Sequence, residues 1–179
     1  MNFGNEIELK LDELVDFIFR SKRKCFAATD IKVSQSDGSS LYSNRELPWL
    51  FTESYNGNTM ERGTEDVYFD MVLVWSMQYR GGTLEPFWDI AEPITAFLKQ
   101  ALMSLPHDFP VRGPPVFSLN EFEFDGKLFR GEFVYRTSWN GDIKRFTGSE
   151  EITWNGKTVF YHDYMGGLIR NKYFKVRVV

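Results

Sequence analysis

The sequence predicts an α+β fold built from two copies of an α-β-β-β(-β) unit. Three observations support this: a long internal repeat, alternating apolar residues interrupted by two-residue turn signals, and one amphipathic segment before each repeat. Two-residue turns join antiparallel strands, whereas parallel strands need long crossovers, so the sheet or sheets should be antiparallel. We expect one helix per unit to pack on the sheet, and a pseudo-twofold axis to relate the units.

The repeat covers residues 49–84 and 133–169. The copies are 84 residues apart at Gly57 and Gly141 and 85 residues apart from the next glycine onward, so one residue is inserted between these points. The second offset matches Glu65 with Glu150, Val67 with Ile152, Trp75 with Phe160 and Tyr79 with Tyr164. A match this long with a single shift indicates an internal duplication.

The first unit should begin with a helix over residues 11–26. The apolar residues that fall on one face at helical spacing are Leu11, Leu14, Val15, Ile18 and Cys25. The basic residues in its last turns are Arg20, Lys22, Arg23 and Lys24. We interpret these as a solvated face that complements the helix dipole, rather than as a nucleic-acid patch.

The strands of the first unit follow a polar stretch. Residues 29–46 are rich in Ser, Asp, Gly and Asn, which predicts a loop with at most a short strand. Alternation indicates a strand over residues 49–55, and Asn56-Gly57 is a hairpin signal because both central residues of a type I′ turn need positive φ. A second hairpin should join residues 65–69 to residues 72–79.

The second unit should begin with a helix that starts at Pro93 and ends before Pro106. Its apolar face is formed by Ile94, Phe97, Leu98, Ala101, Leu102 and Leu105. Residues 106–116 are rich in proline and should form a connector without regular structure. Strands are expected at 117–124 and 127–139. The turn signals of this unit are Asp125-Gly126, Asn140-Gly141 and Asn155-Gly156.

Together these elements predict a single domain over residues 1–179. It should contain repeats at about 11–84 and 93–170, followed by a tail strand at 172–179 that lies at a sheet edge.

Composition restricts the classes of function. The net charge of −4 and the pI of about 5.3 argue against direct nucleic-acid binding, which needs a basic surface. The single cysteine, Cys25, allows no internal disulfide and fits a reducing compartment. We expect a cytoplasmic protein with no membrane contact, because the N-terminus lacks a signal-peptide pattern and no apolar run reaches the length of a transmembrane helix.

The repeated glutamates are the most distinctive polar feature. Glu65 and Glu150 each fall on the more apolar face of a predicted strand, where a charge is costly unless it has a partner. The expected hairpin registers place Tyr161 opposite Glu150 and Ser76 opposite Glu65, so that a hydroxyl group faces each carboxylate.

Two interpretations of these glutamates remain open. Either carboxylate could have a raised pKa and line a pocket that binds an amine or supports acid–base chemistry. Alternatively, each could make a structural hydrogen bond to the preceding glycine loop, with Arg62 or Arg145 nearby. Repetition favours the structural interpretation, because an ancestral unit would retain what it needs to fold.

Other candidates for ligand binding come from the aromatic residues and the connector. Arg112 could bind an anion or cap a loop, and the aromatic stripes around Trp49 and Phe133 could form core or a ligand cage. The ligand-binding candidates are Glu65, Glu150, Tyr161, Tyr79, Tyr164, Trp75 and Arg112. No metal or cofactor is expected, since His107 and His162 do not have zinc-site spacing and no phosphate loop or dinucleotide fingerprint is present. No catalytic residue can be assigned.

Several sequence runs resemble DUF5680, a bacterial family of unknown function, from about residue 14 to residue 170. They are WSMQYRGG (75–82), AFLKQALMSLP (96–106), FPVRGPPVF (109–117), SWNGDIKRFTGSEEI (138–152) and VFYHDYMGG (159–167). Members look like free-standing proteins or the C-terminal part of XRE-type helix-turn-helix regulators, and this chain resembles the free-standing kind. Family members tend to carry a histidine where this chain has Met165. The resemblance implies no established activity, although regulator fusions suggest sensing or oligomerisation.

Three functions are compatible with these observations. A small-molecule-binding or sensor domain should hold Glu65 or Glu150 with several aromatic residues in a cavity between the halves. A self-associating interaction domain should form a homodimer. A hydrolase would use Glu65 and Glu150 as an acid–base pair. The repeated aromatic and carboxylate face and the implied regulator fusions favour the first. The apolar content without a catalytic constellation motivates the second, and an enzyme is the least expected.

Overall fold

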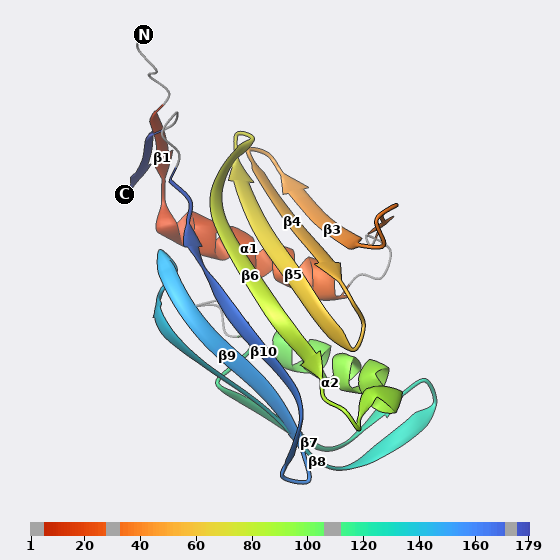
Figure 1. Cartoon of the computed structure of the whole chain (residues 1–179). Helices are drawn as coiled ribbons and strands as arrows, with labels where there is room; N and C mark the ends of the chain where they lie inside the picture. Colours follow the sequence, from red (N-terminus) through yellow and green to blue (C-terminus); the bar gives the residue numbers. More distant parts are fainter. Residues whose placement is uncertain (1–5, 28–32, 106–111, 171–174) are drawn as a thin grey trace.

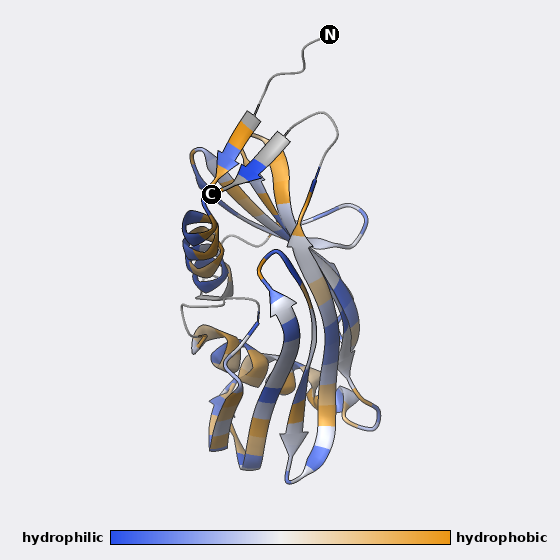
Figure 2. Cartoon of the chain, turned by 90° about the vertical axis from the view of Figure 1, so that its left-hand side faces the viewer, coloured by the Kyte–Doolittle hydropathy of each residue, from blue (hydrophilic) through white to orange (hydrophobic). Residues whose placement is uncertain are grey.

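Nine antiparallel strands form one curved sheet, and both α-helices of the described residues pack on the same face of it (Figures 1 and 2). The computed structural model describes residues 6–27, 33–105, 112–170 and 175–179. The helices are α1 (Leu11–Ala27), the short 3-10 helix η1 (Trp88–Ile90) and α2 (Ala91–Met103). The α+β class and the antiparallel pairing of the main sheet are therefore confirmed.

The main sheet has the strand order β2-β3-β4-β5-β6-β10-β9-β8-β7. Its strands are β2 (Val33–Ser34), β3 (Ser40–Glu46), β4 (Trp49–Asn56), β5 (Met60–Phe69), β6 (Val72–Thr83), β7 (Val116–Phe124), β8 (Lys127–Asp142), β9 (Arg145–Trp154) and β10 (Lys157–Leu168). β3 to β6 and β7 to β10 each run in sequential order, and the two series meet where β6 pairs with β10. At this central pair Tyr79 lies opposite Tyr164. One continuous sheet thus joins the two parts of the chain.

Each helix covers its own hydrophobic core. α1 buries Leu14, Phe17 and Ile18 against the first series of strands, where Phe17 stacks on Trp49 at 5.4 Å between ring centroids. α2 buries Phe97 against the second series, where its ring lies within 5.7 Å of three other phenylalanine rings. Burial of these apolar faces holds the helices on the sheet.

Several turns form as predicted. Asp125-Gly126 and Asn155-Gly156 have positive φ at both residues, as the type I′ turn requires, and the hairpin at residues 70–71 does the same. The predicted turn at Asn140-Gly141 is wrong, because β8 continues to Asp142 and the chain reverses after it. Ile143 is buried there and its carbonyl accepts a hydrogen bond from Trp75. The predicted type I′ turn at Asn56-Gly57 is also wrong, because Asn56 belongs to β4 without a positive φ and residues 57–59 connect β4 to β5.

Tertiary pairing overrides the loop predicted over residues 29–46. Residues 40–46 form β3, which pairs along its whole length with β4. The expected tail strand also differs, because β11 (Lys175–Val178) pairs in parallel with β1 (Glu6–Leu9) in a separate two-stranded sheet, not with an edge of the main sheet. Residues 29–32, the connector residues 106–111 and the tail residues 172–174 lie outside the described ranges. None of the described helices has the length and apolar character needed to cross a bilayer.

Two tyrosine rings occupy the space of missing side chains on neighbouring strands. Gly63 lies opposite Tyr79, and a Cβ at Gly63 would come within 2.1 Å of the Tyr79 ring. Gly148 lies opposite Tyr164, where a Cβ would come within 2.4 Å of that ring. The two glycines therefore allow both tyrosines to lie flat on the sheet.

We expect Gly63→Ala to lower the free energy of unfolding by about 1–3 kcal/mol, since overpacking would displace the Tyr79 ring. The ring cannot yield freely, because its hydroxyl is hydrogen-bonded to buried Glu53. Urea denaturation measures the change. Ser54→Ala, at an exposed position on β4, is the matched control and should stay within about 0.5 kcal/mol of wild type. Equal stability of both variants would contradict this account of the glycine.

Candidate functional site

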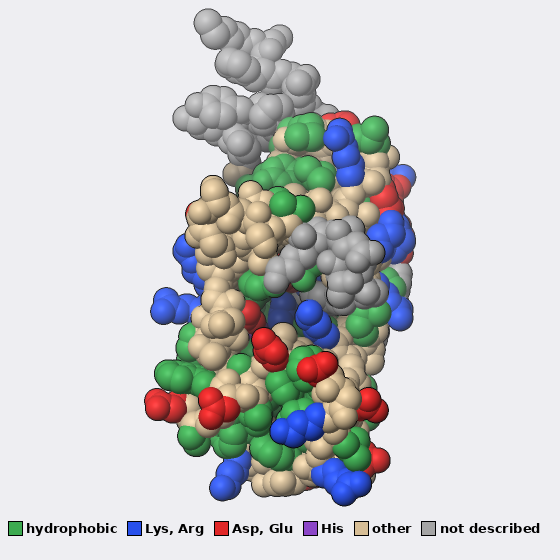
Figure 3. All heavy atoms as spheres, turned by 90° about the vertical axis from the view of Figure 1, so that its right-hand side faces the viewer, with side chains coloured by type: hydrophobic (Ala, Val, Ile, Leu, Met, Phe, Trp, Pro, Cys, Tyr) green, Lys and Arg blue, Asp and Glu red, His purple; other side chains and the backbone are tan. Residues whose placement is uncertain are grey.

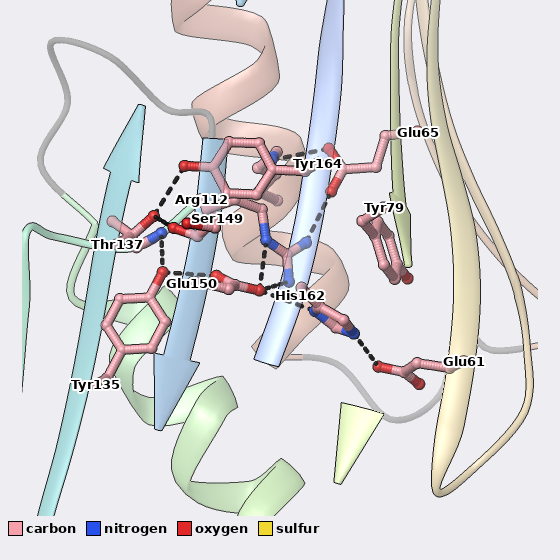
Figure 4. Close-up of polar contacts among 12 residues, drawn as sticks. Glu61, Glu65, Tyr79, Arg112, Tyr135, Thr137, Ser149, Glu150, His162 and Tyr164 are labelled. Atoms are coloured by element: carbon pink, nitrogen blue, oxygen red, sulfur yellow. Dashed lines mark hydrogen bonds and ion pairs between the residues drawn. The ribbon is translucent and has the colours of Figure 1, made fainter. Parts of the chain in front are cut away.

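A network of buried charged residues lies between the sheet and the two helices, with Arg112 at its centre (Figure 4). Nε and Nη2 of Arg112 donate to Oε1 of Glu150 at 3.0 and 2.7 Å. Nη1 lies 3.5 Å from Oε1 of Glu65. One guanidinium group therefore bridges both repeated glutamates. Arg62 and Arg145, the partners expected from the sequence, are both exposed.

Lys22 supplies a second cation to Glu65. Its Nζ lies 2.8 Å from Oε2 of Glu65, and the two side chains are 1% and 0% exposed. The interpretation of Lys22 as part of a solvated face is wrong. It lies four residues after Ile18 and three before Cys25, so it shares their buried stripe, and this spacing could have revealed it. Burial lowers the pKa of Lys22, while Glu65 opposes that shift.

Glu150 has the most complete set of partners. Tyr135 donates to its Oε2 at 2.6 Å, and Nδ1 of His162 lies 2.9 Å from its Oε1. Burial alone would raise the pKa of Glu150, but the Arg112 guanidinium and His162 outweigh it and hold this pKa well below its usual range. Nε2 of His162 lies 3.2 Å from Oε1 of Glu61. Although burial lowers the pKa of His162, hydrogen bonds with Glu150 and Glu61 raise it above its ordinary value.

The predicted strand registers are wrong by one residue. His162, not Tyr161, lies opposite Glu150, and Met77, not Ser76, lies opposite Glu65. Register shifts between residues 158 and 160, and between residues 67 and 68, cause both differences, because an extra residue moves every later side chain to the other face. Tyr161 is therefore 36% exposed on the face away from the network.

Two further candidates have other partners. Tyr164 shares a hydrogen bond of 2.8 Å with the Thr137 hydroxyl and donates to the Ser138 carbonyl. Trp75 stacks on Phe146 in the hydrophobic core. The structure thus gathers Glu65, Glu150, Arg112 and Tyr79 into one region, and places Tyr164, Trp75 and Tyr161 outside the direct contacts of Arg112.

Glu53 is a network residue that sequence analysis missed. Tyr79 donates to its Oε1 at 2.9 Å, whereas Oε2 has no hydrogen-bond partner among the described residues. Burial raises the pKa of Glu53 to about 7, and the negative charge of Glu65 adds to this shift. The sequence pattern could have revealed its burial, because Glu53 alternates with buried Trp49 and Phe51 on one face of β4. Tyr135 and His162 likewise alternate with buried aromatic residues on β8 and β10.

A cavity of about 80 Å³ adjoins Glu53 between α1, α2 and the sheet. Its lining is formed by Cys25, Tyr42, Glu53, Tyr55, Glu61, Tyr79, Thr95, Leu98, Lys99, Leu102 and Arg112. Figure 3 shows this side of the molecule, where acidic and basic side chains gather around a hollow in the middle of the face. Neither Glu65 nor Glu150 lines the cavity.

The potential metal ligands within the described ranges are His, Cys, Asp and Glu side chains. His162 contacts Glu150 and Glu61, but no group of three or more His, Cys, Asp or Glu side chains there has an arrangement that could hold a metal ion. His107 lies outside these ranges.

Fold and site define an α+β domain with a charged network enclosed between one antiparallel sheet and its helices. The family described as "Domain of unknown function (DUF5680)" matches residues 53–169, and this chain belongs to that family. No curated protein and no solved structure gives a match. The resemblance predicted from the sequence is therefore confirmed.

We expect Arg112→Met to lower the free energy of unfolding by about 3–5 kcal/mol, because it leaves Glu65 and Glu150 buried without their shared cation. Arg112→Lys should also destabilise the protein, since a single ammonium group cannot reproduce the forked contacts. Arg130→Met is the control, because Arg130 is 79% exposed in its side chain. Chemical denaturation at pH 7 gives the comparison, and a stable Arg112→Met protein would show that the network is not needed for folding.

Glu53 should make stability depend on pH. Since its folded pKa is raised to about 7, its contribution is full below the unfolded pKa and is lost as pH rises through 7. His162, whose pKa is also raised, acts in the same direction. We expect Glu53→Gln to reduce the loss of stability between pH 5 and pH 8 by on the order of 2 kcal/mol, measured by urea denaturation at each pH. Exposed Glu121→Gln should leave the pH dependence unchanged; a Glu53→Gln profile parallel to wild type would refute the assignment.

Proposed function

We propose that this protein is a small-molecule-binding domain whose ligand presents a cationic amine to Glu53 in the cavity between α1 and α2. One observation carries the proposal: Glu53 is 4% exposed, lines the cavity and has a carboxylate oxygen without a hydrogen-bond partner among the described residues. A buried carboxylate oxygen is costly to leave unpaired, so the cavity favours a group that donates hydrogen bonds or carries positive charge.

The charge balance of the network points the same way. Its carboxylates are Glu53, Glu61, Glu65 and Glu150, and its bases are Lys22, Arg112 and His162. Four acids thus face three bases even when His162 is protonated. Glu53 is the carboxylate with no ion pair among these contacts. Because the pKa of Glu53 is raised to about 7, this fourth negative charge is present only when Glu53 is ionised, and a cationic ligand would balance it.

The remaining lining suits an amine of modest size. Tyr42 and Tyr55 stack at 6.0 Å between ring centroids and line the cavity with Tyr79, and aromatic rings attract cations. A volume of about 80 Å³ accommodates an ammonium head group but not a large ligand. The rest of the ligand would extend past Lys99, which is exposed at the rim.

A hydrolase that uses Glu65 and Glu150 as an acid–base pair has less support. Such a mechanism needs both carboxylates within reach of substrate. Here both are held by Arg112, and neither lines the cavity between the helices.

We also propose that the domain, residues 1–179, arose by duplication of units at about 11–84 and 93–170. The two sequential series of strands and the position of Tyr79 opposite Tyr164 support this, since these tyrosines occupy matching positions in the repeats. The matching Gly63–Tyr79 and Gly148–Tyr164 contacts add to it. A pseudo-twofold axis would then pass between β6 and β10.

The test is a thermal-shift screen with primary and quaternary amines on wild type, Glu53→Gln and Glu121→Gln. A ligand that binds only the folded protein stabilises it by about 2.7 kcal/mol at a hundred times its Kd. We expect a saturable rise in Tm for wild type and for the exposed control Glu121→Gln, and its loss in Glu53→Gln.

If no amine raises the Tm, or if Glu53→Gln responds as wild type does, the amine site is wrong. A crystal structure with an ordered water on Glu53 would then assign the cavity to structure alone. Light scattering would next test the self-associating alternative.

A further inference from the structure

The face of the sheet that carries no helix has a hollow of about 660 Å³ at the junction of the two series of strands. Figure 1 looks onto this face, with the helices behind the sheet. The hollow is lined by Ser54, Asn56, Arg62, Gly63, Thr64, Gln78, Tyr79, Arg80, Thr147, Gly148, Asp163, Tyr164 and Met165. Strand alternation separates it from the buried network, because Thr64 and Gln78 point away from the face that holds Glu65 and Tyr79.

Two arginines lie directly opposite each other in this hollow. Arg62 on β5 pairs with Arg80 on β6, and both side chains are exposed. Like charges opposite each other on neighbouring strands destabilise a sheet. Within the described ranges neither guanidinium has an ion pair within 4 Å, so no carboxylate there offsets the repulsion at contact distance.

The acidic residues nearby do not neutralise the positive charge of Arg62 and Arg80 at contact distance. Asp163 lies opposite Arg80 on β10 without an ion pair within 4 Å. Hydrogen bonds from Ser39 lower the pKa of Asp37, and the charge of Arg62 adds to that shift, so Arg62 acts on Asp37 only at longer range. The arginine pair therefore remains a local concentration of positive charge on a protein whose net charge is −4.

We propose that this hollow binds a small molecule bearing an oxyanion group, held between the guanidinium groups of Arg62 and Arg80. Guanidinium forks match the geometry of carboxylate and phosphate oxygens, and a bound oxyanion turns the repulsion into attraction. Gln78 and Thr64 add neutral hydrogen-bonding groups beside the pair.

The rest of the ligand would lie across the central strands toward β9 and β10. There the hollow offers Thr147, exposed Met165 and the carboxylate of Asp163. A hollow of about 660 Å³ is within the usual range for small-molecule sites. The Asp163 carboxylate, directly opposite Arg80, would disfavour an anionic group on its own side of the pair, so the oxyanion should lie toward Arg62.

Tyr79 borders both cavities, but the arginine pair and Glu53 lie on opposite faces of the sheet and carry opposite charges, so the two sites are distinct. The Glu53→Gln variant should therefore bind an oxyanion as wild type does. This comparison separates failure of one proposal from failure of the other.

Isothermal titration calorimetry with inorganic pyrophosphate and with citrate tests the proposal, at constant ionic strength set with sodium chloride so that general screening is equal. We expect saturable one-site binding by wild type. The Arg62→Gln/Arg80→Gln double variant should bind at least about tenfold more weakly. Arg130→Gln removes an exposed arginine of β8 outside the hollow and should bind as wild type does.

Binding of pyrophosphate alone would assign a phosphate ligand, binding of citrate alone a carboxylate ligand, and binding of both the shared oxyanion chemistry. The double variant should melt at or above the wild-type Tm at low salt, since it removes the repulsion and leaves the core intact. No wild-type binding of either probe, or equal binding by the folded double variant, would overturn the proposal.

Discussion

The buried contact of Arg112 with Glu65 and Glu150 is the interaction on which the interior of this domain depends. Each carboxylate lies on the inner face of the sheet, where an unpaired charge would cost several kcal/mol. One guanidinium from the segment between α2 and β7 offsets both charges, and thereby fastens that segment to strands from both series. The repeated glutamates are joined by a single residue that is not itself repeated.

The location of this network explains the division of the hydrophobic core. One core lies beneath α1 and a second beneath α2. The charged residues occupy the region where these cores meet, next to the central strands β6 and β10. Hydrogen bonds and ion pairs there are directional. They therefore restrict the relative orientation of the two series of strands more than apolar contacts alone would.

The central sheet separates two environments with different chemistry. Its inner face holds the network of four carboxylates and three bases, with a small cavity next to Glu53, whereas its outer face holds paired arginines in a larger hollow. Alternate residues of the same strands build both, since neighbouring side chains of a strand point to opposite faces. Tyr79 contributes its hydroxyl to the inner network and also borders the outer hollow, which its neighbours Gln78 and Arg80 line.

Local signals in the sequence determined much of the fold. Helical spacing located both helices, the Asp125-Gly126 and Asn155-Gly156 turns specified two hairpins, and the apolar setting of Glu65 and Glu150 indicated buried carboxylates that need partners. Only the tertiary structure decided which residues contact these carboxylates. Bulges shift the strand registers by one residue, which brings His162 in place of Tyr161 to Glu150, and the fold brings Lys22 and Arg112 to Glu65 from distant segments. The reason is physical: turns and helical faces arise from interactions between near neighbours in the chain, whereas partners of a buried charge are set by packing between elements far apart in sequence.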